Sequence, residues 1–410
     1  MSTHTDIVPA SQPRRRVRLG IRPLLNPAFL YAATWMFVLI LYSLHFSDLL
    51  DPLETSTTIL VVGSSASFIL GWALESLGRR DGPAVLRPDV PHLATVLSSP
   101  ATGRRATLAG TFFSLGILLE IAIFGGAPIL GTIGIGPEIR YTDFGIPGFH
   151  GMLNAVFYAA CTLQFARILV GASDRKLMLI LISLGYPLLG MSRQVLVSLL
   201  LQYILIYFSL RKSSPQVFLR AGLLFVVILL VFGYLGDLRS GREQFIAIAA
   251  PTFDYPDWLP SGFIWFYIYL CTPLNNVNFN IDMPPNYLPL ETASTLIPSL
   301  AREAFLTSVG NSQQWELVNE SFNVSSLLQS LLTDFGVYGT IGFTLLCGYA
   351  FSRIMRRSVN SPAAFFAVIV LLHGIALSFF ANLLFHLVFL FEIFTLRWIL
   401  KPRAKRVQPA

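Results

Sequence analysis

Long apolar segments alternate with short polar ones along most of this chain. Each apolar segment has roughly 20 residues, the length of helix that crosses the hydrocarbon core of a bilayer. The composition agrees, because only 12% of the residues are charged, against about 25% in soluble proteins. The pattern predicts an all-α polytopic membrane protein with about ten transmembrane helices. We place them at about 27–46, 57–77, 106–124, 148–170, 177–192, 194–210, 220–236, 326–350, 362–380 and 383–400.

Basic residues indicate which ends of the predicted helices face the cytoplasm. All but five of the 29 Lys and Arg residues flank every second loop or a terminus, from residues 14–22 at the start to residues 401–406 at the end. Loops rich in Lys and Arg stay in the cytoplasm during insertion. The pattern therefore predicts cytoplasmic termini. It also explains the net charge of +7, because membrane insertion accounts for the basic residues that flank the helices. We therefore expect no nucleic acid partner.

The predicted helices form a single transmembrane domain, residues 23–400, with a tail on each side. We expect residues 1–22 to be a disordered cytoplasmic tail and residues 401–410 to be a basic cytoplasmic tail. Two long loops, at about 125–147 and 237–325, lie on the other side of the membrane. Loops of this length are uncommon unless they are functional.

The larger loop contains one apolar and aromatic stretch, Ser261 to Asn275. It is too short for a transmembrane helix. A crossing there would also move the basic residues 353–357 to the wrong side. We therefore predict a short re-entrant or interfacial helix inside this loop.

The five basic residues outside the cytoplasmic flanks are all arginines, and they are the first candidates for substrate binding. They are Arg140, Arg193, Arg239, Arg242 and Arg302. Arginine stays charged in a partly dry site, and its planar donors match phosphate oxygens. We therefore expect an anionic, pyrophosphate-bearing, lipid-linked substrate outside the cytoplasm.

Some of these arginines also have an ordinary structural interpretation. Arg193 lies in GMSRQ, a tight turn between two predicted helices, where arginine side chains often reach back to the interface. Arg239 and Arg242 share one side if the seventh helix continues outward. Asp237 and Glu243 are close enough in sequence to form ion pairs with them.

Motifs for metal or nucleotide chemistry are missing from the sequence. It has no HExxH, no paired-cysteine motif, no P-loop and no GxGxxG, so we expect neither a metal nor a cofactor. One acidic residue, Glu392, falls inside the last predicted helix. We expect it to face Arg397 or the interior of the bundle.

Several segments resemble the bacterial oligosaccharide repeat-unit polymerases, the Wzy-type O-antigen polymerase family. Arg140 and Gly151 match a spacing found in such enzymes, an arginine and a glycine separated by ten residues. The resemblance covers most of residues 110–350. The other segments are GGAPIL and FGIPGFHG in the first long loop, GMSRQ, WFYIYLCTPLNN in the second loop, and SLLQSLLTDFGVYGTIG in the eighth helix.

The resemblance implies a metal-independent, GT-C-like helical membrane glycosyltransferase at the periplasmic face of the bacterial inner membrane. Such an enzyme transfers a growing glycan from undecaprenyl pyrophosphate to a new lipid-linked repeat unit, and a chain-length regulator can be its partner. The arginines then stabilise the negative charge of the pyrophosphate leaving group.

The acceptor in such a reaction is a sugar hydroxyl, which needs a general base within hydrogen-bond reach. The candidates for this catalytic role are Asp143, His150 and Glu303. We set Asp237 and Glu243 aside because they neighbour arginines in the sequence.

Aromatic residues of the larger loop are candidates for stacking on sugar rings. They are Tyr255, Trp258 and Trp315, and they complete the predicted substrate-binding set. Trp265 is expected instead to anchor its helix at the membrane interface.

Two other functions remain open at this stage. An O-antigen ligase, which transfers the glycan to lipid A core, has a similar architecture and the same leaving group. A transporter of lipid-linked oligosaccharides is less favoured, because such carriers usually have internal repeats and charge along a central pathway, and neither is evident in the sequence.

Overall fold

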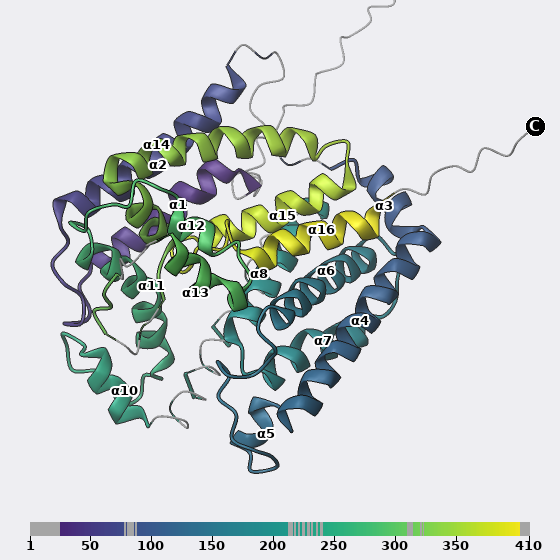
Figure 1. The fold of residues 1–410 in the computed structure, drawn as a ribbon, viewed down its shortest axis with the longest axis horizontal. Coiled ribbons are helices and arrows are strands. Elements are labelled where there is room, and N and C mark those ends of the chain that lie inside the picture. Colours follow the sequence, from purple (N-terminus) through teal and green to yellow (C-terminus); the bar gives the residue numbers. More distant parts are fainter. Residues whose placement is uncertain are drawn as a thin grey trace, which may run out of the picture.

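The structure is a computed structural model that describes residues 25–77, 88–211, 241–309 and 324–401, with isolated positions between these stretches. Helices form the regular structure of the described residues, and no β-strand occurs among them (Figure 1). The helices are α1 (Pro27–Ser43), α2 (Thr55–Ser76), α3 (Val90–Ser98), α4 (Pro100–Phe124), α5 (Pro128–Thr132), α6 (Phe149–Leu169), α7 (Lys176–Leu189), α8 (Arg193–Leu210), α10 (Arg242–Ala249), α11 (Gly262–Phe279), α12 (Leu290–Ser294), α13 (Ser299–Ser308), α14 (Leu327–Arg357), α15 (Pro362–Ala376) and α16 (Leu387–Leu400).

A helix is present at each predicted span that falls on described residues. Apart from isolated positions, the span predicted at 220–236 lies outside the described residues, as do the tail 1–22 and residues 402–410. By length and composition, α2, α4, α6, α8 and α14 are able to cross a membrane. These apolar helices indicate a membrane-embedded protein. The short helices α3, α5, α10, α12 and α13 were not predicted.

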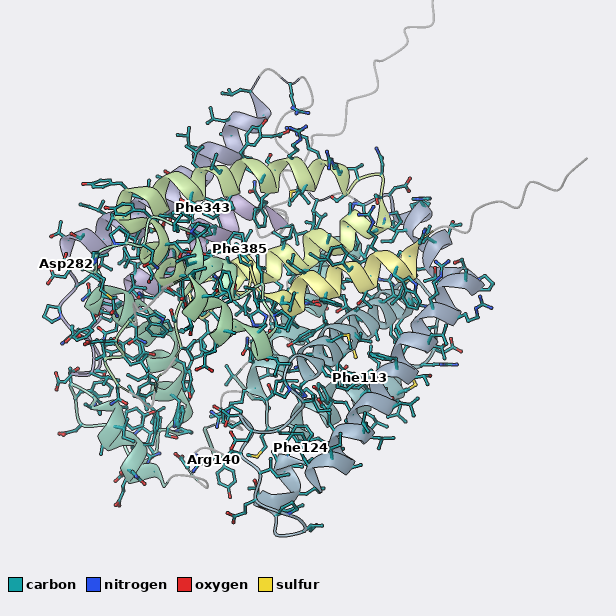
Figure 2. The ribbon with its side chains drawn as sticks, in the orientation of Figure 1. Phe113, Phe124, Arg140, Asp282, Phe343 and Phe385 are labelled. Carbon is teal, nitrogen blue, oxygen red and sulfur yellow. The ribbon has the colours of Figure 1, made fainter. Side chains whose placement is uncertain are left out.

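One end of the bundle, here called the loop end, carries the connectors 44–54, 125–148 and 377–386 together with α10 to α13. Helix α11 lies across this end at a steep angle to α14 (Figure 1). Arg140 and Asp282, labelled in Figure 2, lie on the side of the molecule away from α3.

Helix α11 contacts one connector along most of its length, which explains its position across the loop end. The hydroxyl of Tyr267 accepts a hydrogen bond from the Phe46 N–H (3.0 Å), and Asn278 Oδ1 accepts one from the Glu54 N–H (2.8 Å). Among the described helices, α11 is not one of those with the hydropathy of a span. A helix is thus present where a short one was predicted, and it continues to Phe279.

Buried asparagines in the last turns of α11 hold the neighbouring connectors. Asn276 donates to the carbonyls of Phe322 and Val324 (3.2 and 3.1 Å) and accepts from the Val318 N–H (3.1 Å). Its side chain is almost fully buried. Because each amide satisfies backbone groups that water does not reach, these residues fix the loop end. The asparagines are Asn275, Asn276, Asn278 and Asn280.

We expect the substitution Asn276→Ala to destabilise the protein by about 3 kcal/mol, because it leaves buried backbone groups without hydrogen-bond partners. The thermal unfolding midpoint of the detergent-purified protein measures this loss. The matched control is Asn360→Ala, an exposed asparagine whose loss should change stability by less than about 0.5 kcal/mol. Equal midpoints for the two variants would show that the Asn276 amide does not hold the connector.

The opposite end of the bundle, here called the basic end, gathers the basic residues that flank the helices. Arg105, in the first turns of α4, donates to the Trp398 and Ile399 carbonyls at the end of α16 (both 3.3 Å). Arg211, just after α8, donates to the Leu169 carbonyl at the end of α6 (2.6 Å). Basic residues that are scattered along the sequence therefore share one location in the fold.

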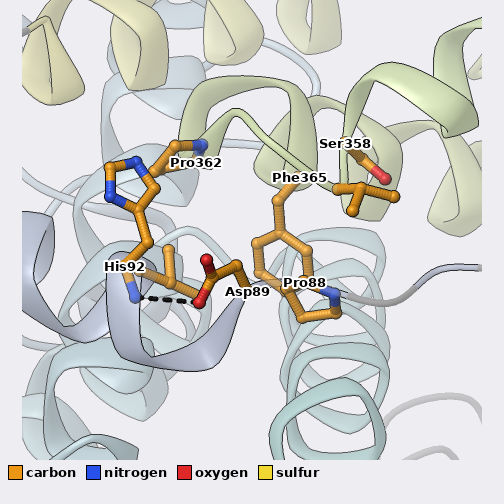
Figure 3. Close-up of a pocket in the computed structure, with 8 residues that line it drawn as sticks. Pro88, Asp89, His92, Ser358, Pro362 and Phe365 are labelled. Atoms are coloured by element: carbon orange, nitrogen blue, oxygen red, sulfur yellow. Dashed lines mark hydrogen bonds between the residues drawn. The ribbon is translucent and has the colours of Figure 1, made fainter.

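A small pocket lies at the basic end, between α3 and the connector from α14 to α15 (Figure 3). Asp89 accepts from the His92 N–H at its edge (3.1 Å). The cavity volume is about 10 Å³, room for about one water molecule. Ligand pockets usually measure about 300–1,000 Å³, so this one is too small for a lipid-linked glycan.

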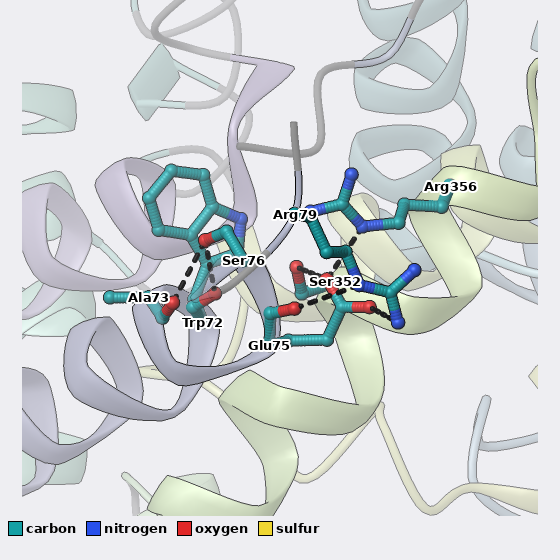
Figure 4. A network of polar contacts seen from close by, with 7 residues as sticks. All are labelled: Trp72, Ala73, Glu75, Ser76, Arg79, Ser352 and Arg356. Atoms are coloured by element: carbon teal, nitrogen blue, oxygen red, sulfur yellow. Dashed lines mark hydrogen bonds and ion pairs between the residues drawn. The ribbon is translucent and has the colours of Figure 1, made fainter. Parts of the chain in front are cut away.

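Also at the basic end, the buried carboxylate of Glu75 joins α2 to α14 (Figure 4). It accepts hydrogen bonds from Arg356 (2.6 Å) and Ser352 (3.0 Å) and forms an ion pair with Arg79 (2.9 Å). Two guanidinium groups compensate its charge, which would otherwise be strongly destabilising in a dry environment. The network fixes the relative position of the two helix ends.

Glycines allow α2 and α14 to pack with their backbones in contact. A Cβ atom at Gly348 would lie 2.1 Å from the Phe68 carbonyl oxygen, and one at Gly71 would lie 1.9 Å from the Leu345 carbonyl oxygen. Small residues permit this close approach of membrane helices, and any side chain at either position would force the helices apart.

Helix α14 is interrupted at Gly336, whose φ of 68° and ψ of −178° are not helical. Glycine adopts this conformation without steric cost. Just before the interruption, the buried carboxylate of Asp334 accepts from the N–H groups of Glu291 (2.7 Å) and Thr292 (2.8 Å) at the start of α12. A negative charge is favourable at a helix N-terminus, so Asp334 positions α12.

Candidate functional site

The predicted site residues that the structure describes lie at the loop end, on several connected elements. Thr132 of α5 donates to the sulfur of Met191 in the turn between α7 and α8 (3.3 Å). The Leu387 N–H at the start of α16 donates to the Thr295 carbonyl (3.1 Å). Arg239 is outside the described residues, and nothing in the structure tests its predicted role.

Arg193 begins α8 and lies over an aromatic cluster. Its guanidinium carbon is 5.4 Å from the centre of the Trp265 ring. The other partners of Trp265 are Phe245, stacked at 3.6 Å, and Tyr269, stacked at 5.3 Å. A guanidinium over an indole face gains a cation–π attraction. Trp265, predicted as an interface anchor, therefore contacts a predicted substrate-binding arginine.

Arg242 begins α10 and is held by backbone carbonyls. It donates to the Leu259 and Pro256 carbonyls, both at 2.9 Å, and lies 5.6 Å from the centre of the Tyr255 ring. The predicted ion pair with Glu243 is not found among the described residues. Carbonyl groups fix the side chain, and no carboxylate of the described residues forms an ion pair with it.

The condition under which Arg239 and Arg242 would share one side, a helix that continues outward through both, is not met at Gly241. Gly241 has a φ of 79°, and α10 starts only after it. Glycine readily adopts positive φ, and this separates Arg242 from the preceding segment. Asp237 accepts a hydrogen bond from the Ser261 hydroxyl, and its expected pairing with Arg239 lies outside the described residues.

Contacts through one stack of rings bring Arg193 and Arg242 into the same region. Arg242 and Phe245 are one turn apart on α10, and Phe245 stacks on the indole of Trp265 that Arg193 covers. Residues three apart lie on the same side of a helix. Two arginines from distant parts of the sequence therefore flank one aromatic cluster at the loop end.

Arg302, on α13, belongs to a second group of contacts at this end. Its Nε donates to the Ser294 carbonyl (3.0 Å). Its charge also acts on Glu291, where burial and the negative charge of Asp334 raise the pKa of the carboxyl group and Arg302 opposes that rise. Glu291 was not predicted as a site residue. Its place beside Arg302 depends on its contact with Asp334, which lies far away in the sequence.

His150 has a carboxylate partner that the sequence did not reveal. Its Nδ1 lies 2.8 Å from Glu120 Oε2, and the second oxygen of Glu120 accepts from the Ile146 N–H (2.9 Å). Glu120 is fully buried near the end of α4, whereas the His150 side chain is 28% exposed. The carboxylate orients the imidazole ring through Nδ1. The other ring nitrogen, Nε2, is then the one that could take a proton, as in catalytic histidine–carboxylate pairs.

The histidine lies next to the segment that holds Arg302. A Cβ atom at Gly148 would lie 3.7 Å from Pro298 Cβ, and Pro298 directly precedes α13. The start of α6 therefore touches the start of α13, and the His150–Glu120 pair and Arg302 share one part of the loop end.

The other predicted residues lack a comparable setting. Arg140 and Asp143 are exposed, and in the view of Figure 2 Arg140 lies between α5 and α10. Glu303 is exposed on α13, and Trp258 is 81% exposed. Exposed groups are weaker candidates for chemistry that requires a partly dry site.

The predicted aromatic residues differ in their surroundings. Tyr255 packs beneath Arg242 and its hydroxyl donates to the Pro260 carbonyl (2.7 Å). Burial raises the pKa of this hydroxyl, while Arg242 opposes the effect. Trp315 is partly buried in a short described segment. Tyr255 is thus a support for Arg242 at the loop end.

Across the described residues, no group of three or more His, Cys, Asp or Glu side chains is placed to hold a metal ion. Comparisons of the chain with protein-family models, with curated proteins and with solved structures found no match.

Proposed function

We propose that this protein polymerises undecaprenyl-pyrophosphate-linked oligosaccharide repeat units at the periplasmic face of the bacterial inner membrane. Two arginines at the loop end carry the proposal. Arg193 lies over the Trp265 ring, and Arg242 lies over Tyr255, one helical turn from the Phe245 that stacks on Trp265. With the basic end in the cytoplasm, both guanidinium groups face the periplasmic side. The proposal includes ten spans and a GT-C-like arrangement of the helices.

The arginines bind the pyrophosphate of the glycan donor in this proposal. As the bond between the sugar C1 and the pyrophosphate oxygen breaks, negative charge develops on the leaving group. Fixed guanidinium groups stabilise that charge without reorganisation. The carbonyl partners of Arg242 and the indole beneath Arg193 hold both groups in place before the substrate arrives.

His150 is the general base of the proposed reaction. Its ring takes the proton from the acceptor hydroxyl as the hydroxyl oxygen bonds to the sugar C1, and Glu120 stabilises the imidazolium that forms. The sequence left Asp143, His150 and Glu303 open. We favour His150 because it alone among them has a buried carboxylate partner in the described structure.

We expect Arg193→Ala to abolish long polysaccharide chains while single repeats are still attached to lipid A core, because pyrophosphate binding is lost. Arg193→Lys should restore only part of the chain length, since an ammonium group keeps the charge but not the planar donors. The chain-length ladder of a complemented deletion strain measures both. The control is Arg353→Ala, an exposed arginine at the basic end.

The deletion strain also separates this proposal from the ligase alternative. Loss of a polymerase leaves one repeat attached to each core, whereas loss of a ligase removes all attached glycan. A deletion strain without any attached repeat would overturn the proposal in favour of the ligase. Elongation of lipid-linked repeats by the purified protein in liposomes, without their translocation, would exclude the transporter.

A further inference from the structure

A buried carboxyl group lies inside the helix bundle, away from the proposed glycosyl-transfer site. Glu392, on α16, has an exposed fraction of 0%. Its Oε2 accepts from Gln202 Nε2 of α8 (3.1 Å), and Gln202 Oε1 accepts from the Thr162 hydroxyl of α6 (2.6 Å). A chain of hydrogen bonds thus joins three helices around one acidic residue.

The second oxygen of this carboxyl group has no hydrogen-bond partner in the part of the chain that the structure describes. Glu392 Oε1 is buried and makes no hydrogen bond to the described residues. The same residues contribute no ion pair to Glu392. Arg397, its expected partner, is exposed on the same helix. A carboxylate anion in hydrocarbon without a cation is very unfavourable, so a positive charge must accompany it.

The groups around Glu392 favour a proton over a metal cation. Tyr158 and Cys161 of α6 are within electrostatic range of the carboxyl group, and Ser198 lies one turn before Gln202 on α8. These are neutral groups, and the described residues bring no ion pair to the carboxyl group. A sodium or potassium ion needs a cavity with several oxygen ligands, whereas a proton needs none.

We propose that Glu392 forms an intramembrane site for a single proton, carried on Oε1, with Gln202 and Thr162 fixing the other oxygen. The site is independent of the proposed glycosyl transfer. The Glu392–Gln202 hydrogen bond links α16 to α8, and both helices pack on α6 and α15.

The first test uses the neutral isostere of a protonated glutamic acid. Glu392→Gln should keep the thermal midpoint of the wild-type protein in lipid nanodiscs, whereas Glu392→Ala should lower it by several degrees. The midpoint should be the same in sodium, potassium and choline chloride at equal ionic strength. A midpoint that rises with sodium in the wild-type protein and not in Glu392→Gln would replace the proton by a sodium ion and overturn the proposal.

The second test needs no stable Glu392 variant. The infrared spectrum of the wild-type protein at neutral pH should contain the C=O stretch of a buried protonated carboxyl group. The control variant Glu54→Gln, which removes an exposed carboxyl group, should keep this band, and Glu392→Gln should lose it. A wild-type spectrum without the band would show that Glu392 is ionised and would refute the proposal.

Discussion

Replacing Gly348 by alanine is expected to destabilise the protein, although alanine is the better helix former. A helical glycine-to-alanine change gains up to about 1 kcal/mol from helix propensity. At Gly348 the new Cβ would lie 2.1 Å from the Phe68 carbonyl oxygen, a backbone atom that does not move alone. Overpacking of this kind typically costs about 1–3 kcal/mol, and the two helices must separate along their whole contact.

Gly342, on the same helix, provides the matched control. A Cβ atom there would meet nothing within 4 Å, so Gly342→Ala keeps the gain in helix propensity without the clash. We expect the two variants to differ by about 3 kcal/mol in stability. The thermal midpoints of both proteins in the same detergent measure this difference. If Gly348→Ala were as stable as Gly342→Ala, α2 and α14 would not pack as closely as described.

The second large effect is expected at His150. Loss of a positioned general base lowers the rate by about 10²- to 10⁴-fold, so His150→Ala should abolish elongation of lipid-linked repeats by the purified protein. Glu120→Gln keeps an acceptor for the Ile146 N–H but removes the charge that stabilises the imidazolium. Glu120→Gln should therefore also lose much of the elongation activity.

The matched control for His150 is His92→Gln, which changes an exposed histidine at the basic end and should leave elongation unchanged. Thermal midpoints of all three variants separate lost catalysis from lost folding. Full elongation by folded His150→Ala would remove this residue from the mechanism, and Asp143 or Glu303 would then be the base to test.

Hydropathy was sufficient to place the long helices, because the requirement for about 20 apolar residues is visible in the sequence alone. The structure also contains two further predicted features, namely the turn at GMSRQ between α7 and α8 and the helix near Ser261. The interruption at Gly336 was missed, since a glycine inside an apolar stretch has the same pattern whether it bends or continues a helix. The short helices of the loop end were missed because they are too short for a periodic signal.

The sequence was sufficient to predict which residues belong to the candidate site. It was not sufficient to predict which side chains those residues contact. Charge sorting singled out Arg193 and Arg242, but their contacts with Trp265 and Tyr255 depend on the tertiary fold. The Glu120–His150 pair joins positions 30 residues apart, and no local pattern connects them. Glu392 faces the interior of the bundle, one of its two expected settings, and not Arg397. Its partner Gln202 was not predicted, because it lies far away in the sequence.

The interruption at Gly336 divides α14 between two mechanical units. The stretch before it is fastened through Asp334 to α12, whereas the stretch after it is fastened to α2 by the glycine crossing and by Glu75. The non-helical Gly336 between them allows the first stretch to lie at a different angle from the second. In the proposed polymerase, the loop end that would hold the growing chain is thus fastened separately from the basic end.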